Sequence, residues 1–273
     1  MNEHLTATQT STDVHEGSLT SRDGTSIAYT RLGSGPALVM VHCVGVSRAT
    51  TPQPTLPAAL AEHFTVYTYD RRGKGRSGNT APYAVEREFE DLQAVIEEAG
   101  GSAVVYGFSS GATLSLLAAQ AGLPIDRLVL LEPPLFPDAD PDLHLATEAQ
   151  RRVDEDRAAA HRWFDTQIVG VPEEVLAEMP PLSEEDIANT PSIVHELTFL
   201  PATPATRFAD VSRPTLLLAS DKTAPIIHTF AEQLEQALPD VTYRILPGEW
   251  HGLDDATITE AAAHFSGASA QTR

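Results

Sequence analysis

Short apolar runs recur along the chain and alternate with segments whose apolar positions follow a helical spacing. Seven runs predict strands, and they lie at 26–31, 37–42, 64–69, 103–106, 128–131, 215–219 and 241–246. Most of these runs lack the regular polar alternation of a strand that faces water on one side. They are typical of strands covered on both faces, as in a parallel sheet.

Helical patterns separate these strands. The clearest covers residues 85–99, where apolar residues return every three or four positions until Gly100 and Gly101 interrupt the pattern. Further helices are predicted at 56–62, 112–121, 230–238 and 258–265. Because strands and helices alternate, the sequence predicts an α/β fold with a doubly wound, mostly parallel sheet and right-handed crossovers.

One segment departs from this alternation. Residues 135–209 contain helical patterns, eight prolines and a net charge of 5 Arg − 15 Asp and Glu = −10, half of the formal −20 of the whole chain. The segment also carries aromatic and branched apolar residues, which argue against a disordered acidic loop. We predict that 135–209 is a helical cap over the strand ends. The core is then 17–134 and 210–266, with polar tails at 1–16 and 267–273.

Charge and cysteine content restrict the partners. A chain with a net charge of −20 and only two Lys does not suit a nucleic-acid ligand, because phosphate neutralisation needs clusters of Lys and Arg. Cys43 is the single cysteine, so no intrachain disulfide is possible. No apolar run approaches the roughly 18 residues of a membrane span, and the first residues lack the apolar stretch of a signal peptide. We expect a cytoplasmic protein, monomeric or homodimeric, that binds neither nucleic acid nor membrane.

The sharpest chemical signal is the pentapeptide Gly107-Phe108-Ser109-Ser110-Gly111 between a predicted strand and a predicted helix. A sharp strand-to-helix turn holds its central residue in a strained conformation and needs small residues two positions before and after it. Such a turn exposes the Ser109 hydroxyl at a helix N-terminus, where free N–H groups favour negative charge. The pattern predicts a nucleophilic serine. The alternative is a glycine-rich turn with a helix-capping serine.

A serine nucleophile needs a base and an acid that orients the base. Among ten histidines, His251 lies in a loop after a predicted strand and before the last helix, at the same sheet edge as Ser109. Two carboxylates follow strands at that edge, Glu132 after 128–131 and Asp221 after 215–219. Either could reach one imidazole, and the residues alone do not decide between them.

Together these features resemble the α/β-hydrolase superfamily. Three further segments carry the resemblance: Val39-Met40-Val41-His42 before an oxyanion loop, the Asp-x-Arg-Gly-like turn from Asp70 to Ser77, and the acid-bearing strand end before Asp221. The resemblance implies that backbone N–H groups of Val44 and Ser110 hold the oxyanion. Cys43 stands where the family usually has Gly. It is a rival candidate nucleophile, but it does not lie in a sharp strand-to-helix turn like that of Ser109. The haloalkane dehalogenases of this superfamily have Asp where Ser109 stands, so the resemblance does not favour a dehalogenase.

These residues lead to a functional hypothesis. We expect a serine hydrolase that cleaves an ester, thioester or lactone bond of a small to medium neutral substrate, with no cofactor and no metal ion. The alternatives are a biosynthetic cyclase, acyltransferase or perhydrolase on the same fold, and a ligand-binding protein without catalysis. Specificity is expected from the cap, and the candidate substrate-binding residues are Leu135, Phe136, Trp163, Phe164 and Phe199.

Overall fold

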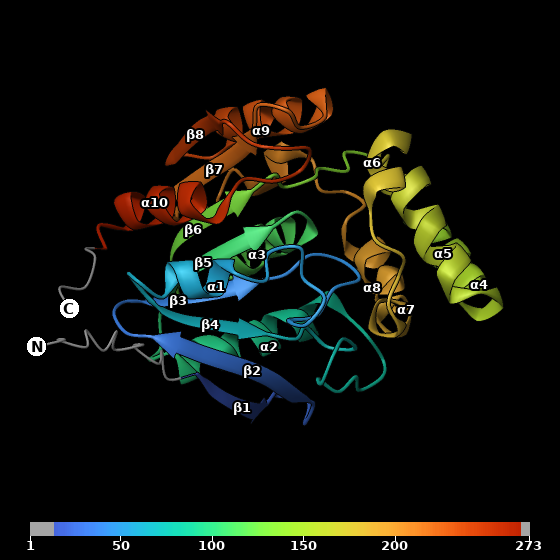
Figure 1. Ribbon diagram of the computed structural model, residues 1–273, viewed down its shortest axis with the longest axis horizontal. Coiled ribbons are helices and arrows are strands. Elements are labelled where there is room, and N and C mark those ends of the chain that lie inside the picture. Colours follow the sequence, from blue (N-terminus) through green and yellow to red (C-terminus); the bar gives the residue numbers. More distant parts are fainter. Residues whose placement is uncertain (1–13, 269–273) are drawn as a thin grey trace, which may run out of the picture.

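Eight strands within the described residues, 14–268, form one sheet in the computed structural model (Figure 1). They are β1 (His15–Thr20), β2 (Ser26–Gly33), β3 (Ala37–Val41), β4 (Thr65–Tyr69), β5 (Ala103–Phe108), β6 (Ile125–Leu131), β7 (Thr215–Ser220) and β8 (Val241–Leu246). Their order across the sheet is β1-β2-β4-β3-β5-β6-β7-β8. From β4 to β8 neighbouring strands are parallel, whereas β1 and β2 are antiparallel additions at one edge. The predicted fold class is confirmed.

The first strand differs from the expectation. The predicted polar tail ran through residue 16, but His15 and Glu16 already belong to β1. This strand lies at the sheet edge and consists mostly of exposed, polar residues. It therefore has no apolar run from which a strand could be predicted. Most of the predicted tails, namely 1–13 and 269–273, lies outside the described residues, and Gly267 caps the last helix.

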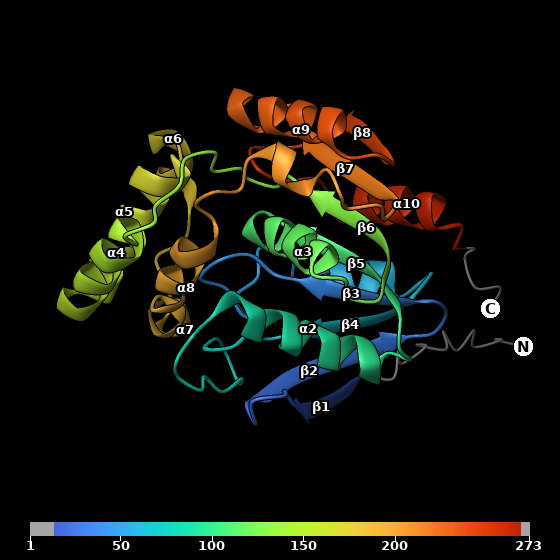
Figure 2. The ribbon, with the colours of Figure 1, turned by 180° about the vertical axis from the view of Figure 1, so that it is seen from behind.

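Helices cover both faces of the sheet. One face carries α2 (Val85–Glu98), α3 (Ser110–Gln120) and α9 (Pro225–Ala237), which lie in front in Figure 2. The other carries α1 (Leu56–Leu60) and α10 (Asp255–Ser266), in front in Figure 1. Successive residues of a strand pack against the helices on opposite faces of the sheet, because side chains alternate along a strand. Thus Val39 and Val105 pack toward α2 and α3, whereas Leu38 and Val104 pack toward α1 and α10.

A group of short helices stands beyond the ends of the central strands, on the side away from α10 (Figures 1 and 2). We call them the cap helices: α4 (His144–Glu155), α5 (Arg157–Trp163), a π-helical turn (Phe164–Val169), α6 (Glu173–Glu178), α7 (Glu184–Asn189) and α8 (Ser192–Phe199). A 3-10 turn (Ala205–Phe208) then leads back to the core. The cap helices have an apolar cluster of their own, built around Ala149, Ala160, Phe164 and Leu197. They therefore form a separate layer over the strand ends.

Candidate active site

Ser109 sits at the turn between β5 and α3. Its φ of 53° and ψ of −126° are a conformation that residues with a Cβ rarely adopt. The turn is fixed from the side, because the Ser109 N–H donates to the carbonyl oxygen of Leu131 at the end of β6 over 2.9 Å. The side chain is partly exposed and lines a cavity below the cap helices.

The two glycines of the pentapeptide are required by space. A Cβ on Gly107 would lie 2.6 Å from Cα of Ala112, and one on Gly111 would lie 2.3 Å from the carbonyl oxygen of Val41. Both distances are far inside van der Waals contact with backbone atoms. The sequence folds into this turn because it has no side chain at either position.

His251 is presented by a tight loop between β8 and α10. Glu249 and Gly252 exchange backbone hydrogen bonds of 2.9 and 3.3 Å, so Trp250 and His251 form the tip of a small hairpin. Gly248 allows the close approach, since a Cβ there would lie 2.4 Å from the Gly252 carbonyl oxygen. The His251 side chain keeps 17% of its exposure and lines the same cavity as Ser109.

Glu132 is the acid that pairs with His251. Its Oε2 lies 2.5 Å from Nδ1 of His251 and also accepts from Oγ1 of Thr223 over 2.8 Å. Its Oε1 accepts from the N–H of Ser220 over 2.8 Å. The carboxylate is fully buried, and both of its oxygens are hydrogen-bonded. A buried carboxylate held in this way can orient an imidazole and stabilise its protonated form.

The backbone marks the same three residues independently. Five residues other than glycine have positive φ among those described, and three of them are Ser109, Glu132 and His251, at 53°, 51° and 54°. Strained backbone persists where the surrounding structure enforces it, and it clusters at functional sites. Positive φ thus occurs at the expected nucleophile, the expected base and one of the two candidate acids.

Asp221, the other candidate acid, is placed elsewhere. It is exposed, and its Oδ1 accepts from the N–H of Gly248 over 3.0 Å, at the base of the His251 loop. No hydrogen bond joins it to His251 among the described residues. Asp221 thus supports the loop from outside. The structure pairs the imidazole with Glu132, whereas the sequence left Asp221 as an equal candidate. The reason is that the His251 hairpin reaches past the end of β7 to Glu132 at the end of β6.

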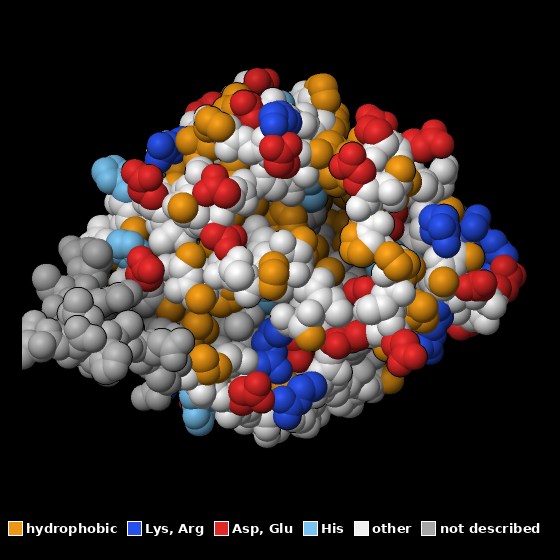
Figure 3. Space-filling view, in the orientation of Figure 1, with side chains coloured by type: hydrophobic (Ala, Val, Ile, Leu, Met, Phe, Trp, Pro, Cys, Tyr) orange, Lys and Arg blue, Asp and Glu red, His pale blue; other side chains and the backbone are white. Residues whose placement is uncertain are grey.

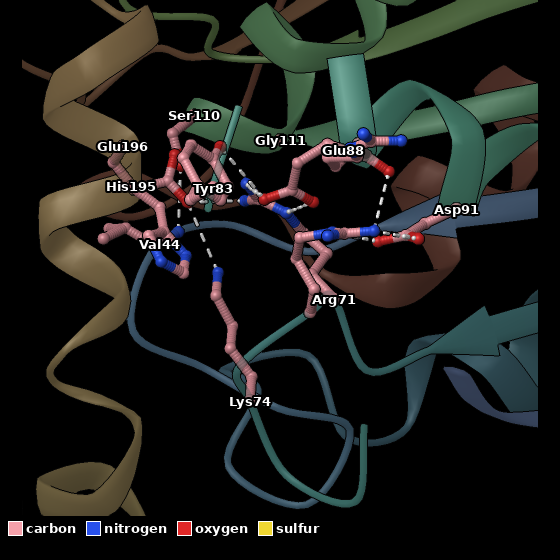
Figure 4. A network of polar contacts seen from close by, with 12 residues as sticks. Val44, Arg71, Lys74, Tyr83, Glu88, Asp91, Ser110, Gly111, His195 and Glu196 are labelled. Carbon is pink, nitrogen blue, oxygen red and sulfur yellow. Dashed lines mark hydrogen bonds and ion pairs between the residues drawn. The ribbon is translucent and has the colours of Figure 1, made fainter. Parts of the chain in front are cut away.

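The loop after β3 brings Val44 beside Ser110 of α3, and these are the two residues expected to donate to an oxyanion. We call residues 42–45 the oxyanion loop, after that expected role. The N–H of Val44 donates to Oγ of Ser110 over 2.9 Å (Figure 4), and both residues line the cavity. Gly45, with φ of +70°, makes the turn that brings Val44 over the N-terminus of α3. The N–H of Ser110 has no hydrogen-bond partner among the described residues and belongs to the first residue of that helix.

Cys43 and His42 are buried within this loop. The Cys43 side chain packs in the apolar cluster beside α1, and burial raises the pKa of its thiol to about 11. His42 bonds through Nε2 to Oγ1 of Thr68 over 2.7 Å, and burial lowers its pKa to about 4. The thiol is therefore protonated and the imidazole neutral at pH 7. Within residues 14–268, no group of three or more His, Cys, Asp or Glu side chains is arranged to hold a metal ion.

The cavity that Ser109 and His251 share has a volume of about 230 Å³. Figure 3 shows this face of the molecule hollowed between the core and the cap helices, with apolar side chains in and around the hollow. Within the described residues, no Asp, Glu, Lys or Arg side chain lines the cavity. An uncharged wall of this kind does not stabilise an ionised group of a ligand.

Three of the five expected substrate-binding residues line this cavity: Leu135, Phe136 and Phe164. The other two do not. Trp163 packs on the guanidinium of Arg152, 4.8 Å from its ring centroid, and Phe199 belongs to the main core cluster. The apolar pattern identifies buried aromatics but not the helix face that borders the cavity. The lining also includes residues that the sequence did not lead us to expect, among them Ile168, Thr223, Ile227, Phe230 and Trp250. Thr223 and Trp250 could have been found as neighbours of the candidate acid and base.

Comparison with known proteins agrees with this architecture. A sequence model of the Alpha/beta hydrolase family matches residues 38–262, which is most of the chain. The chain therefore belongs to the alpha/beta-hydrolase family. It is an enzyme of hydrolase type.

Similar proteins are known from sequence and structure. The solved structure of an alpha/beta hydrolase from Sphaerobacter thermophilus is 40% identical, has a TM-score of 0.82, and covers 92% of this chain and 100% of that one. A hydrolase from Pseudomonas aeruginosa shares the fold at 22% identity, with a TM-score of 0.70 and coverage of 93% and 99%. The uncharacterized hydrolase YraK of Bacillus subtilis is 35% identical over 97 residues, which are 34% of this chain and 35% of that protein. The matched part is thus about a third of that relative's length.

Within residues 14–268, no helix is both long and apolar enough to cross a membrane.

Proposed function

We propose that the protein is a serine hydrolase that cleaves an ester, thioester or lactone bond through an acyl-enzyme on Ser109. The observation that carries the proposal is the pairing of the buried Glu132 with His251, 2.5 Å from oxygen to nitrogen, at the wall of the cavity into which Ser109 opens. The strained turn at Ser109 and the free helix N-terminus beside it support the same chemistry.

The reaction follows from these positions. Ser109 Oγ attacks the substrate carbonyl carbon while Nε2 of His251 takes the hydroxyl proton. Glu132 accepts the Nδ1–H of the imidazole throughout and stabilises its positive charge. The C–O or C–S bond to the leaving group then breaks, and His251 returns the proton to that group. Water next attacks the acyl-enzyme, with His251 again taking the proton, and the acid is released with Ser109 regenerated.

Backbone donors stabilise the negative oxygen of each tetrahedral intermediate. The N–H of Ser110 points from the N-terminus of α3, where the helix dipole adds a favourable field. The second donor is the N–H of Val44, which becomes available to substrate when the Ser110 hydroxyl rotates about its Cα–Cβ bond. Removal of one such donor typically costs about 10²–10³ in kcat.

The cavity favours a small neutral acyl group. Pockets for drug-sized ligands measure roughly 300–1,000 Å³, and the volume of about 230 Å³ lies below that range. Apolar side chains such as Leu135, Phe164 and Phe230 surround the place where an acyl chain would extend from Ser109. A carboxylate or phosphate on that chain would meet no positive partner in the described lining.

Stopped-flow kinetics with p-nitrophenyl esters of two to twelve acyl carbons tests this proposal. We expect a burst of p-nitrophenolate equal to the enzyme concentration, highest kcat/KM for short or medium chains, and loss of both in Ser109→Ala. Full hydrolysis by Ser109→Ala would exclude the mechanism. Product analysis with water and an alcohol in competition then separates hydrolysis from acyl transfer.

A further inference from the structure

A buried cluster of charged residues joins cap helix α8 to the oxyanion loop (Figure 4). Two cations, Arg71 and Lys74, come from the turn after β4, and two carboxylates come from helices, Glu88 from α2 and Glu196 from α8. Their side chains are at most 1% exposed. The cluster is balanced in charge, as burial of ions requires.

Glu196 binds both cations through one oxygen. Its Oε1 lies 2.6 Å from Nη1 of Arg71 and 3.3 Å from Nζ of Lys74. Its Oε2 is buried and has no hydrogen-bond partner among the described residues. The polar contacts of this carboxylate within the described residues are therefore those with Arg71 and Lys74. Arg71 is held on its other side by Glu88, with contacts of 2.8 and 3.1 Å.

The two cations in turn hold the oxyanion loop. Nη1 of Arg71 donates to the carbonyl oxygen of His42 over 3.2 Å, and Nζ of Lys74 donates to that of Cys43 over 2.9 Å. These two carbonyls immediately precede Val44. The carbonyl of Cys43 and the N–H of Val44 belong to one planar peptide group, so fixing the oxygen fixes the direction of the N–H. A cation on the carbonyl also polarises the amide and strengthens its N–H as a donor.

We propose that Glu196, acting through Lys74, is a positioning residue that aims the N–H of Val44 at the reacting oxygen and so couples the seating of cap helix α8 to catalysis. The inference rests on the proposed function of Ser109. The ring of His195, next to Glu196 on α8, stacks on Tyr83 with centroids 3.8 Å apart and planes at 4°. This second contact seats the same turn of the helix on the core.

The chain offers a matched control for a purely structural role. Asp91 on α2 is fully buried and accepts two 2.7 Å hydrogen bonds from Arg72, in the same basic turn as Lys74. Within residues 14–268, the hydrogen bonds and ion pairs of Asp91 and Arg72 do not involve residues 42–45. Asp91→Asn therefore removes a buried ion pair of the same turn without releasing the oxyanion loop.

The test compares Glu196→Gln, Lys74→Met and Asp91→Asn by steady-state kinetics, thermal unfolding and inhibition by a phenylboronic acid. The boronate forms a tetrahedral adduct on Ser109 that places an oxygen in the oxyanion site. We expect kcat to fall about tenfold in Glu196→Gln and about a hundredfold in Lys74→Met. KM should stay within about twofold, and the boronate Ki should rise by the same factor as kcat falls. Asp91→Asn should lower the melting temperature but keep kcat and Ki within about twofold of wild type.

Two results would overturn the inference. One is equal effects of Glu196→Gln and Asp91→Asn on kcat and Ki at equal loss of stability. The other is a double variant, Glu196→Gln with Lys74→Met, whose loss of kcat equals the product of the two single losses. If Glu196 acts through Lys74, Glu196→Gln causes no further loss of kcat once Lys74 is Met. If Glu196→Gln does not fold, Glu196→Asp retains the charge but retracts it from Lys74. We expect a several-fold lower kcat with unchanged KM, and wild-type kcat in that variant would equally refute the coupling. A wild-type enzyme that never acylates Ser109 would instead refute the proposed function itself.

Discussion

Oε2 of Glu132 lies 2.5 Å from Nδ1 of His251, although 119 residues separate them in the sequence. The pairing arises because β6 is adjacent to β7 and the His251 loop folds back over both strand ends. The carboxylate that pairs with His251 thus follows β6, the strand next to β5, which leads to Ser109. Asp221, one strand further along, supports the loop by a bond to Gly248.

This arrangement predicts unequal effects for the two carboxylates. Glu132→Gln places an amide where His251 needs an anion, so the imidazole loses its orientation and its counter-charge. We expect kcat to fall by about three to four powers of ten, the range known for removal of the acid in such a triad. Asp221→Asn, which alters only the support of the loop, should change kcat less than about fivefold. Both are measured with one chromogenic ester, and unfolding curves show whether the variants remain folded. A larger loss in Asp221→Asn would reverse the assignment.

Neighbouring aromatics in the cap provide a test of the cavity. Phe164 lines it and Trp163 does not. Phe164→Leu should enlarge the acyl site and shift the preferred chain to longer acyl groups, by about fourfold in kcat/KM per accommodated CH₂ at about 0.8 kcal/mol. Trp163→Leu should leave the ratio of kcat/KM between hexanoate and acetate esters within about twofold. An equal shift in both variants would show that the cap responds as a whole rather than through its lining.

Two histidines, the buried His42 and the half-buried His195, predict loss of stability in mild acid. Burial lowers the pKa of His42 and of His195 from 6.5 to about 4. Between those values the unfolded chain binds a proton that the folded chain does not. The free energy of unfolding therefore falls as the pH drops from about 6.5 toward 4, by up to about 1.4 kcal/mol per pH unit for each histidine. Urea unfolding at pH 7.5 and pH 5.0 measures this loss.

His195→Phe isolates one of these contributions. Phenylalanine can retain the stack on Tyr83, and Nδ1 of His195 has no hydrogen-bond partner to lose among the described residues. Glu88, Lys74, Glu196 and Arg71 face this ring and remain in the variant. We expect similar stability at pH 7.5 and a smaller loss than wild type at pH 5.0. An unchanged acid sensitivity would show that His195 is already protonated in the folded state.

The single thiol should be unreactive in the native protein. Burial raises the pKa of Cys43 to about 11, so almost no thiolate exists at pH 8. We expect Ellman's reagent to modify it only after denaturation, with activity retained in the native sample throughout. Rapid native modification that abolishes turnover would favour the rival nucleophile.

The sequence could predict the elements that are dictated locally. Apolar runs identified the parallel strands, and the spacing of Gly107 and Gly111 around Ser109 identified the turn. The acid could not be chosen, because that choice depends on the direction in which the His251 hairpin folds, and this is set by tertiary packing. Edge strand β1 was missed because it has almost no buried residues. The role of Glu196 could not be predicted either, since only the docking of α8 brings it to Lys74 across 122 residues.

Mass spectrometry after reaction with a fluorophosphonate shows whether Ser109 is the nucleophile. We expect one adduct per chain, located by peptide mapping on Ser109, and no adduct in Ser109→Ala. Glu132→Gln should form the same adduct at a greatly reduced rate. An adduct on another residue, or an unlabelled protein that still hydrolyses esters, would contradict the account.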